Sequence, residues 1–371
     1  MKLGRQIAAF LRLRQRRRWG RSGPVSHARG PVTHVVILDG TLSTLAPGDE
    51  TNAGLTWKLM AESGPRADRS LYYEAGLQWD DWPGTRDVIT GRGLNRQIER
   101  AYGFLASRYR PGDRIFLFGF SRGAFAVRSL AGAIHKVGLP RAEAATVRTV
   151  RQAYRHYRCS GESEAARAFT RLYCHSEVPI EMIGVWDTVK ALGLRVPLLW
   201  RFSEPTHRFH THELCPNVRH GYHALARNET RVAYAPEMWD TTAHPGRVEQ
   251  RWFRGSHGDV GGQLKGFYPA RPLANVPLVW MLDRAEAAGL RLPEGWRDRF
   301  PLDAASPTTG TWQGWGKAFL LRAPRDVGRD PSEVIDPSVA ATPRPRRAHE
   351  IAPVTEWAED LTEGAAPETA R

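Results

Sequence analysis

One five-residue segment of this chain has the composition of a nucleophile site. Gly119-Phe120-Ser121-Arg122-Gly123 fits the pattern G-x-S-x-G, in which a serine sits on a strained turn between a strand and a helix. Gly119 and Gly123 support such a turn, because side chains there would clash with the neighbouring strand and helix. A serine at this place can also simply cap the following helix. Because a strand and a helix are expected on either side, we interpret Ser121 as a nucleophile.

A serine hydroxyl is a poor nucleophile unless a base lies within hydrogen-bonding distance and a carboxylate orients that base. Asp187 lies 66 residues after Ser121, at the end of a predicted strand, and His257 lies 70 residues after Asp187. The order serine, acid, histidine is that of the triad that accompanies the G-x-S-x-G pattern. The alternatives are that Asp187 caps a turn and that His257 bonds its own backbone. Asp259, beside the histidine, is the other acid that we consider for the triad.

Two backbone N–H groups are expected to stabilise the negative charge that forms when a serine attacks a carbonyl group. One belongs to Arg122, the residue after the nucleophile, and the other to Gly40 or Thr41, in the loop that follows an early strand. Asp39 precedes this loop and either braces it or forms an Asx turn. We expect the bracing role because the strand ends at this residue.

Apolar runs and turn signals predict the elements that position these residues. We expect buried strands at 34–38, 115–118, 179–186 and about 248–253, and helices at 93–109, 124–135, 141–175 and 277–290. Between them we expect an irregular excursion over the site at 188–235 and a glycine-rich loop at 255–262. Strands that alternate with helices favour the α/β class, here an α/β-hydrolase-like, mostly parallel sheet with helices on both faces and irregular insertions over the site. Reactive groups collect beyond the carboxyl ends of such strands.

Composition divides the 371 residues into three parts. Residues 1–30 are basic, residues 31–340 form the predicted catalytic domain, and residues 341–371 are rich in Pro, Ala, Thr and Glu and are expected to be loosely ordered. Nine of the net fourteen positive charges fall in residues 1–30, which contain no acidic residue. No apolar run approaches the ~18 residues of a membrane-spanning helix, which argues against a transmembrane protein.

The basic start of the chain has two interpretations. With Leu3, Ile7, Phe10, Leu11 and Leu13 among its arginines, it forms either a short helix on an anionic membrane surface or a disordered, solvated tail. The arginines interrupt the apolar core that a Sec signal peptide needs, so we expect a cytoplasmic location. Peripheral membrane contact through residues 1–30 and delivery by a specialised secretion system stay open. A nucleic-acid binder would rest on these arginines alone, and we expect no specific nucleic-acid partner.

Neither a cofactor nor a metal ion is expected. Cys159, Cys174 and Cys215 are odd in number and lack CxxC spacing, which indicates free thiols in a reducing compartment rather than a disulfide framework or a zinc site. Five histidines lie close together in the sequence but lack the HxxE or HExxH spacing of a metal site on a helix. They are His207, His210, His212, His220 and His223.

These residues resemble the type VI secretion phospholipase effector Tle1-like catalytic domain family, a family of uncharacterised α/β hydrolases. The resemblance runs from about residue 33 to 290, with a weaker match at 336–339. The segments that carry it are Leu38-Asp39-Gly40-Thr41, Thr51-Asn52, Tyr72-Tyr73, Gly119 to Ala124, Gly184 to Val189, His223 to Ala226, Trp252-Phe253 and His257 to Gly262. The resemblance implies that Ser121, Asp187 and His257 form a catalytic triad.

The sequence departs from the family pattern at several places, none of them in the triad. Leu42-Ser43 replaces a Trp-Asn pair, Lys190 and Gly258 stand where Gly and Ser are usual, and Gln263 stands where another Gly is common. We expect the changes at the first loop and at Lys190 to alter the pocket for the acyl chain or headgroup.

The sequence therefore predicts a serine-dependent hydrolase of carboxylic esters with a lipid or other acyl-ester substrate. The resemblance implies a phospholipase or lipase, because family members in secretion systems look like phospholipases with A1 or A2 activity. Two alternatives stay open: an esterase for small soluble acyl esters, and a non-catalytic interaction protein on a hydrolase scaffold.

Overall fold

The computed structural model describes residues 29–76, 92–159, 163–189, 213–242, 245–312, 316–317 and 319–343. The chain divides into two compact units, Met1–Pro31 and Val32–Arg371. Nearly all of the predicted basic segment 1–30 lies outside the described residues, as do most of the predicted C-terminal segment 341–371 and the departure from the family pattern at Lys190. All helices and strands that the structure describes belong to the second unit.

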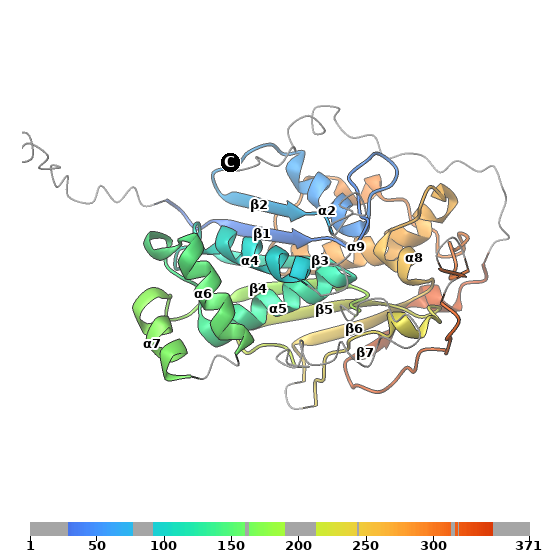
Figure 1. Ribbon diagram of the computed structural model, residues 1–371. Helices are drawn as coiled ribbons and strands as arrows, with labels where there is room; N and C mark the ends of the chain where they lie inside the picture. The colour runs from blue at the N-terminus through green and yellow to red at the C-terminus, as the bar shows by residue number, and fades with distance from the viewer. Residues whose placement is uncertain are drawn as a thin grey trace, which may run out of the picture. The chain divides into compact units, whose positions relative to one another are not determined.

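Seven parallel strands form one sheet in the order β2-β1-β3-β4-β5-β6-β7 (Figure 1). Their bounds are β1 Thr33–Leu38, β2 Arg69–Glu74, β3 Arg114–Phe120, β4 Ile180–Trp186, β5 Val218–Ala226, β6 Val248–Phe253 and β7 Glu333–Ile335. The chain runs outward from β1 to β2, crosses back to β3 on the other side of β1, and then continues outward to β7. The loops after β1 and β3 therefore diverge at a topological switch point, where open parallel sheets bind their ligands.

The central strands are buried on both faces. In β3, Ile115 and Leu117 point into one core, and Phe116 and Phe118 point into the other, as the two-residue period of a strand requires. Burial on both faces explains why this strand is a continuous apolar run in the sequence.

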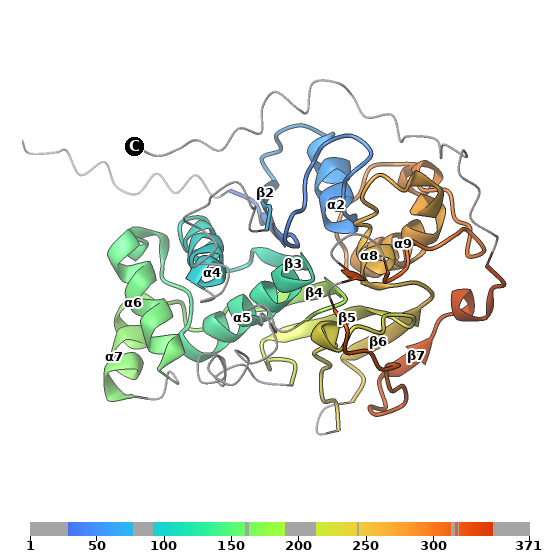
Figure 2. The ribbon, with the colours of Figure 1, turned by 45° about the vertical axis from the view of Figure 1, so that its right-hand side comes forward.

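Helices cover both faces of the sheet (Figures 1 and 2). The α-helices are α2 Asn52–Ala61, α4 Arg92–Ala106, α5 Arg122–Val137, α6 Val147–Arg158, α7 Glu164–Tyr173, α8 His257–Gly261 and α9 Arg271–Ala287. On one face α4 and α5 pack on the strands, with α6 and α7 against them, and on the other face lie α2 and α9, with α8 beside them. The predicted α/β class, with a mostly parallel sheet between helices, is confirmed. Among the described residues, no helix combines the length and the apolar character needed to cross a membrane.

Short 3₁₀ helices occur between these elements and after β7. They span Ala142–Ala144, Val232–Tyr234, Tyr268–Ala270, Trp296–Arg299 and Pro337–Ala340. The second of them, Val232–Tyr234, lies between β5 and β6 and carries an aromatic side chain to the candidate site.

The predicted irregular excursion at 188–235 is wrong for much of its second half. β5 lies within it and is a central strand between β4 and β6. The sequence hides this strand because Arg219 and His220, near its less buried start, break the apolar run, and because the buried His223 is polar. The part of the excursion from 190 to 212 lies outside the described residues.

The predicted glycine-rich loop at 255–262 is also wrong in part, because it contains the short helix α8. Gly255 and Gly262 have positive φ values of 116° and 77° and form the turns on either side of this helix. His257, expected in a loop, is therefore the first residue of a helix.

Candidate active site

Ser121 lies at the turn between β3 and α5, at the topological switch point. Its backbone has φ 57° and ψ −119°, a conformation that residues other than glycine rarely adopt. The Ser121 N–H donates to the carbonyl oxygen of Trp186, at the end of β4, over 3.0 Å. The Ser121 side chain makes no capping bond with α5, so the alternative in which this serine only caps the helix does not hold.

Gly119 and Gly123 leave room for this turn. A Cβ atom on Gly123 would lie 2.0 Å from the carbonyl oxygen of Leu38 in β1, and one on Gly119 would lie 2.6 Å from the carbonyl oxygen of Gly123. Both neighbours are backbone atoms, which cannot rotate away. A side chain at either position would therefore displace α5 from the sheet.

Ser121, His257 and Asp187 form one hydrogen-bonded chain. The Nε2 atom of His257 lies 2.9 Å from the Oγ atom of Ser121, and its Nδ1 atom lies 2.5 Å from the Oδ2 atom of Asp187. Ser121 keeps 8% of its surface exposed, whereas His257 keeps 4% and Asp187 none. The structure thus brings together the three residues that the sequence proposes as a triad, in a geometry in which a histidine can take the serine proton.

The first turn of α8 places the histidine. The backbone N–H of Ser256 donates to Asp259 Oδ2 over 2.8 Å, as in a capping box at the start of α8, and the Ser256 hydroxyl donates to the same oxygen over 2.8 Å. The Oδ1 atom of Asp259 accepts a bond from the N–H of Thr309 over 2.7 Å. Asp259 therefore holds the helix that carries His257, and Asp187 is the acid bonded to the imidazole.

Two aromatic rings flank the imidazole of His257. The ring centroids of Phe120 and Tyr234 lie 4.8 and 4.9 Å from the centroid of His257. The backbone N–H of His257 donates to Glu229 Oε2 over 3.1 Å. The guanidinium of Arg231 is bonded to Glu229 and lies 3.9 Å from the centre of the Tyr234 ring. These contacts restrict the rotation of the imidazole.

Asp187 comes directly after β4, and its carboxylate accepts four bonds. Oδ1 accepts from the N–H of Ala226 over 3.0 Å and from Arg325 Nη1 over 2.5 Å, while Oδ2 is bonded to His257 and accepts from Arg325 Nη2 over 2.9 Å. Burial alone would raise the pKa of Asp187, but the charge of Arg325 and the bond with His257 outweigh burial and hold that pKa well below its usual range. The carboxylate is therefore ionised at neutral pH.

Sequence reasoning does not find Arg325. It lies 138 residues after Asp187 in the chain and follows none of the predicted strands. It is also one of 53 Lys and Arg residues, so its residue type carries no signal. Tertiary packing alone brings it to the carboxylate.

The expected oxyanion donors lie in the two loops of the switch point. The Arg122 N–H is the first of α5, where N–H groups have no acceptor within the helix. The N–H of Gly40 already donates to Asp39 Oδ1 over 2.6 Å, so it is a poor candidate for the second donor. Thr41 is therefore the second candidate.

Asp39 braces this loop by bonds to two other elements. Its Oδ2 atom accepts from the hydroxyl of Thr51 at the start of α2 over 2.7 Å and from the hydroxyl of Tyr73 in β2 over 2.8 Å. Burial raises the pKa of Asp39 to about 6, although these bonds oppose the shift. The carboxylate ties the end of β1 to α2 and β2, and so fixes the loop that holds Thr41.

Of the histidines considered for a metal site, His220 and His223 are described by the structure, and neither belongs to the hydrogen-bonded chain of Ser121, His257 and Asp187. The buried His223 in β5 accepts a bond from the N–H of Thr188 over 3.0 Å. Burial and the nearby Arg128 lower the pKa of His223 to about 3, so its ring is neutral. His220 also lies in β5. The structure does not describe His207, His210 and His212. In the part of the chain that it does describe, no three His, Cys, Asp or Glu side chains are arranged to hold a metal ion.

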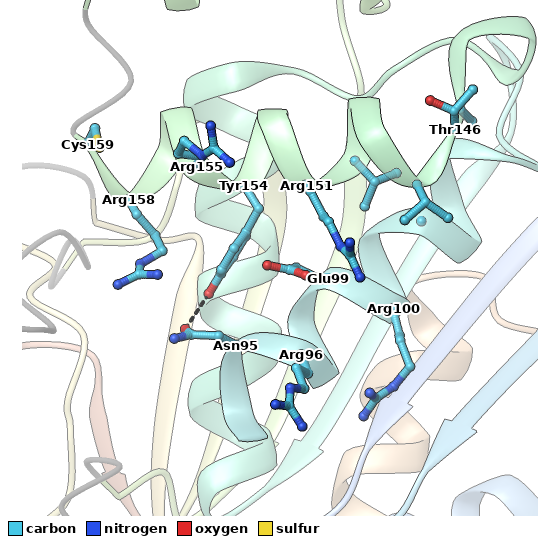
Figure 3. Close-up of a pocket in the computed structure, with 14 residues that line it drawn as sticks. Asn95, Arg96, Glu99, Arg100, Thr146, Arg151, Tyr154, Arg155, Arg158 and Cys159 are labelled. Carbon is cyan, nitrogen blue, oxygen red and sulfur yellow. Dashed lines mark hydrogen bonds between the residues drawn. The ribbon is translucent and has the colours of Figure 1, made fainter. Parts of the chain in front are cut away.

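A cavity of about 1200 Å³ lies between α4 and α6 (Figure 3). The hydroxyl of Tyr154 on α6 donates to Asn95 Oδ1 on α4 over 2.7 Å. None of the residues that line the cavity belongs to the segments that hold the triad, so the cavity is separate from the candidate active site, and its lining is basic. Its charged lining residues are Arg96, Arg100, Arg151, Arg155, Arg158 and Glu99.

Comparisons with known proteins relate most of the second unit to one family. A family model described as T6SS, phospholipase effector Tle1-like, catalytic domain matches residues 33–284. The uncharacterised protein YEL023C of Saccharomyces cerevisiae is 29% identical over an alignment of 198 residues, which covers 46% of this chain and 28% of the yeast protein.

Two solved structures are similar at lower identity. An uncharacterised protein from Pseudomonas aeruginosa is 16% identical, with a TM-score of 0.40, over 75% of this chain and 50% of that one. A Tle1 effector bound to the VgrG spike from the type 6 secretion system is 17% identical, with a TM-score of 0.39, over 63% of this chain and 51% of that one. The chain thus spans less than a third of the yeast relative and about half of each solved chain.

Proposed function

Because the chain belongs to the family of type VI secretion phospholipase effector Tle1-like catalytic domains, we propose that it is a serine hydrolase that cleaves the acyl esters of phospholipids. The observation that carries this proposal is the hydrogen-bonded chain from Ser121 through His257 to Asp187. A serine, a histidine and an ionised carboxylate, bonded in this order, are the catalytic groups with which serine hydrolases carry out acyl transfer. Their position at the switch point of a parallel sheet supports the same function.

The first half of the proposed reaction is acylation of the serine. His257 Nε2 takes the proton of Ser121 Oγ as that oxygen attacks the ester carbonyl carbon, and a tetrahedral oxyanion forms. The N–H groups of Arg122 and Thr41 donate to the oxyanion. When the tetrahedral intermediate collapses, the ester C–O bond breaks, and His257 gives its proton to the departing alcohol oxygen of the lysophospholipid. The acyl chain stays on Ser121.

The second half is hydrolysis of the acyl-enzyme. His257 Nε2 takes a proton from a water molecule as that water attacks the acyl carbon, and the same two N–H groups hold the second oxyanion. The bond between the acyl carbon and Ser121 Oγ then breaks, and His257 returns the proton to the serine. A fatty acid leaves and the enzyme is regenerated. Asp187 remains ionised throughout and stabilises the charged imidazole.

The test is an assay of the purified protein on mixed phospholipid vesicles, with the products identified by mass spectrometry. We expect free fatty acid and lysophospholipid in equal amounts, and loss of both after treatment with a fluorophosphonate that labels Ser121. Hydrolysis of short-chain soluble esters without attack on any phospholipid would favour a soluble esterase. A Ser121 that does not react with the fluorophosphonate would favour a non-catalytic scaffold.

Contact with the membrane is part of this proposal. Residues 1–30 carry nine positive charges and no negative charge, which suits an anionic lipid surface. Such contact would raise the local concentration of substrate without any change in the triad.

A further inference from the structure

We propose that Arg325 is a positioning residue of the triad, which holds the Asp187 carboxylate in the orientation that His257 needs and offsets its charge, so that the imidazole stays neutral to a lower pH. This inference rests on the proposed function and deepens it. It assigns a role to a residue that lies beyond 33–284, the part of the chain that the family model matches.

The geometry is a two-pronged ion pair inside the protein. The two terminal nitrogens of Arg325 donate to the two different oxygens of Asp187, at 2.5 and 2.9 Å. Arg325 is 9% exposed and Asp187 is fully buried. Paired bonds of this kind fix both the distance and the plane of a carboxylate, which a single bond does not.

The guanidinium is itself anchored on both sides of the carboxylate. Nη1 also donates to the carbonyl oxygen of Ala226 at the end of β5 over 2.9 Å, and Nη2 donates to that of Tyr234 over 2.5 Å. Tyr234 packs its ring against His257. Arg325 therefore links the carboxylate, the end of a central strand and the segment that flanks the imidazole.

The chain around Arg325 is docked on the segment that flanks His257. The Ala323 N–H donates to the carbonyl oxygen of Thr230 over 2.8 Å, and the Val232 N–H donates to that of Leu321 over 3.1 Å. Arg322 donates from Nη1 to the hydroxyls of Thr230 and Thr311, at 3.2 and 2.8 Å. If Arg325 had only a structural role, it would help to hold these two segments together, as Arg322 does. Its replacement would then leave the protonation of the His257 ring unchanged.

The charge argument depends on the ionisable groups around the pair. Among the described residues these include Arg325 in the segment before β7, Glu229, Arg231 and Tyr234 after β5, and His223 within β5, while Asp259 in α8 is held by its bonds to Ser256 and Thr309. His223 is neutral, and Glu229 and Arg231 pair with each other. Arg325 is the cation that bonds directly to Asp187, so its loss leaves a buried negative charge beside the imidazole. A proton shared by the imidazole and the carboxylate would then be held to a higher pH.

The test compares Arg325→Gln, Arg325→Lys and Arg322→Gln with the wild type. The rate on a soluble short-chain ester is measured from pH 5 to 9, which removes any effect of membrane binding. For Arg325→Gln we expect the acid limb of kcat/KM to move up by about one to two pH units and kcat at high pH to fall about 10²-fold, with KM nearly unchanged. Arg325→Lys keeps the charge, so we expect its acid limb to stay near that of the wild type while kcat falls. In Arg322→Gln the acid limb should not move.

Direct titration of the His257 ring by nuclear magnetic resonance gives a readout that does not depend on turnover. The ring should hold its proton to a higher pH in Arg325→Gln than in the wild type, and to a similar pH in Arg325→Lys, which serves as the second variant if the glutamine variant folds poorly. An unmoved titration in Arg325→Gln, an equal shift in Arg322→Gln, or a shift in Arg325→Lys as large as that expected for the neutral variant would overturn the proposal. If Ser121 of the wild type did not react with a fluorophosphonate, the proposed hydrolase function would be contradicted. The titration of the His257 ring would still decide the role of Arg325.

Discussion

Ser121 and Asp187 share a backbone conformation that their residue types disfavour. Their φ values are 57° and 41°, and each residue directly follows a central strand. Positive φ at such residues costs of order 1–3 kcal/mol and persists only where the surroundings hold it. Backbone bonds to the neighbouring strand do so here, from Ser121 N–H to Trp186 and from Asp187 N–H to Ala224. We infer that these bonds hold the two side chains at the edge of the sheet, where His257 meets them.

Replacing Ser121 or His257 with Ala is expected to reduce ester hydrolysis by about 10⁴-fold or more, because the members of a triad act as a unit. Both variants should stay folded, since neither substitution adds an atom or breaks a bond within the sheet. The measurement is kcat/KM on a soluble ester beside a thermal melt of each variant. Wild-type rates in either variant would remove that residue from the triad.

Asp187→Asn should lose activity to about the same degree as Ser121→Ala and His257→Ala, and it should also be less stable than the wild type. The amide would leave the buried guanidinium of Arg325 without its counter-charge, and breaking a buried pair in this way costs about 3–5 kcal/mol. Urea denaturation of Asp187→Asn and Ser121→Ala, compared at pH 7, measures the difference. Equal midpoints would contradict the view that Arg325 depends on this carboxylate.

Asp39 should make the stability of the fold depend on pH between about 4 and 6. Burial raises its pKa to about 6 in the folded chain, whereas an unfolded aspartate has a pKa of about 3.9. The folded state therefore keeps a proton that the unfolded state has lost, so stability falls as pH rises through this interval. The contribution is fully present below about pH 4, lost above about pH 6, and roughly 3 kcal/mol in all.

The check on Asp39 is a set of urea melts of the wild type and Asp39→Asn from pH 4 to pH 7. The difference in the free energy of unfolding between them should change by roughly 3 kcal/mol over that interval, with the wild type relatively more stable at the acid end. A difference that stays constant with pH would show that Asp39 does not titrate there.

The sequence can bring the triad together because each member follows a parallel strand, and the carboxyl ends of parallel strands meet at one edge. The role of Asp39 is also visible in the sequence, because the residue ends an apolar run. Arg325 has no such signal: its place beside Asp187 depends on how the chain after α9 packs. The preference for Thr41 over Gly40 likewise needs the structure, because it depends on the bond from the Gly40 N–H to Asp39.

At the scale of elements, the sequence predicts β1, β3 and β4, which are buried on both faces, and β6, in which Gln250, Trp252 and Phe253 are buried. β1, β3 and β4 are mostly apolar, and the sequence predicts them within one or two residues at most ends. β2 is an edge strand with every residue half-buried, so its pattern is mixed. β5 carries arginine and histidine near its start, and β7 is only three residues long. None of these three follows the apolar pattern of a buried strand.

The helices also divide into those that the sequence predicts and those that it does not. α4 has an apolar stripe against the sheet and a polar outer face, which is the pattern that sequence reading detects. Nearly every residue of α2 is buried, so α2 has no clear stripe and its sequence does not predict it. α8 is five residues long, too short for any period, and depends on the Ser256 and Asp259 cap.

The contact between α5 and β1 predicts a large effect of one methyl group. Gly123→Ala would place a Cβ atom 2.0 Å from the carbonyl oxygen of Leu38, so we expect a loss of about 3 kcal/mol or more, or no folded protein. Gly103→Ala in α4 is the matched control. Its Cβ atom would lie 3.7 Å from the methyl groups of Val150, an ordinary contact, and should raise stability by about 0.5–1 kcal/mol. Denaturation midpoints measure both, and similar effects of the two substitutions would refute the argument.

At the scale of the whole molecule, two concentrations of positive charge take no part in the proposed chemistry. One is the segment 1–30, with nine basic residues. The other is the cavity between α4 and α6, with five arginines and one glutamate, of which Arg100 already pairs with Glu74 (Figure 3). Either place would attract an anionic lipid surface. An experiment on membrane binding must therefore separate them.

We predict that residues 1–30 govern binding to anionic membranes and leave the chemistry unchanged. Each Lys or Arg near an anionic surface contributes about 1 kcal/mol, so even partial contact of nine such residues would matter. Replacing all nine with Gln in the full chain should lower the hydrolysis of anionic vesicles, chiefly at low salt, where charges are weakly screened. The turnover of a soluble short-chain ester should be nearly unchanged.

The matched control is a chain with residues 1–30 intact and Arg151, Arg155 and Arg158 of the cavity replaced by Gln. It should keep its activity on anionic vesicles, because these exposed side chains lie in α6 and line the cavity, and none of them belongs to the candidate active site. Loss of vesicle activity in this control alone would indicate that the cavity, rather than residues 1–30, contacts the membrane. If the first variant lost activity on both substrates equally, the segment would support the fold instead. If it lost activity on neither, the segment would be a solvated tail, and the charge at the start of the chain would cease to support a membrane substrate.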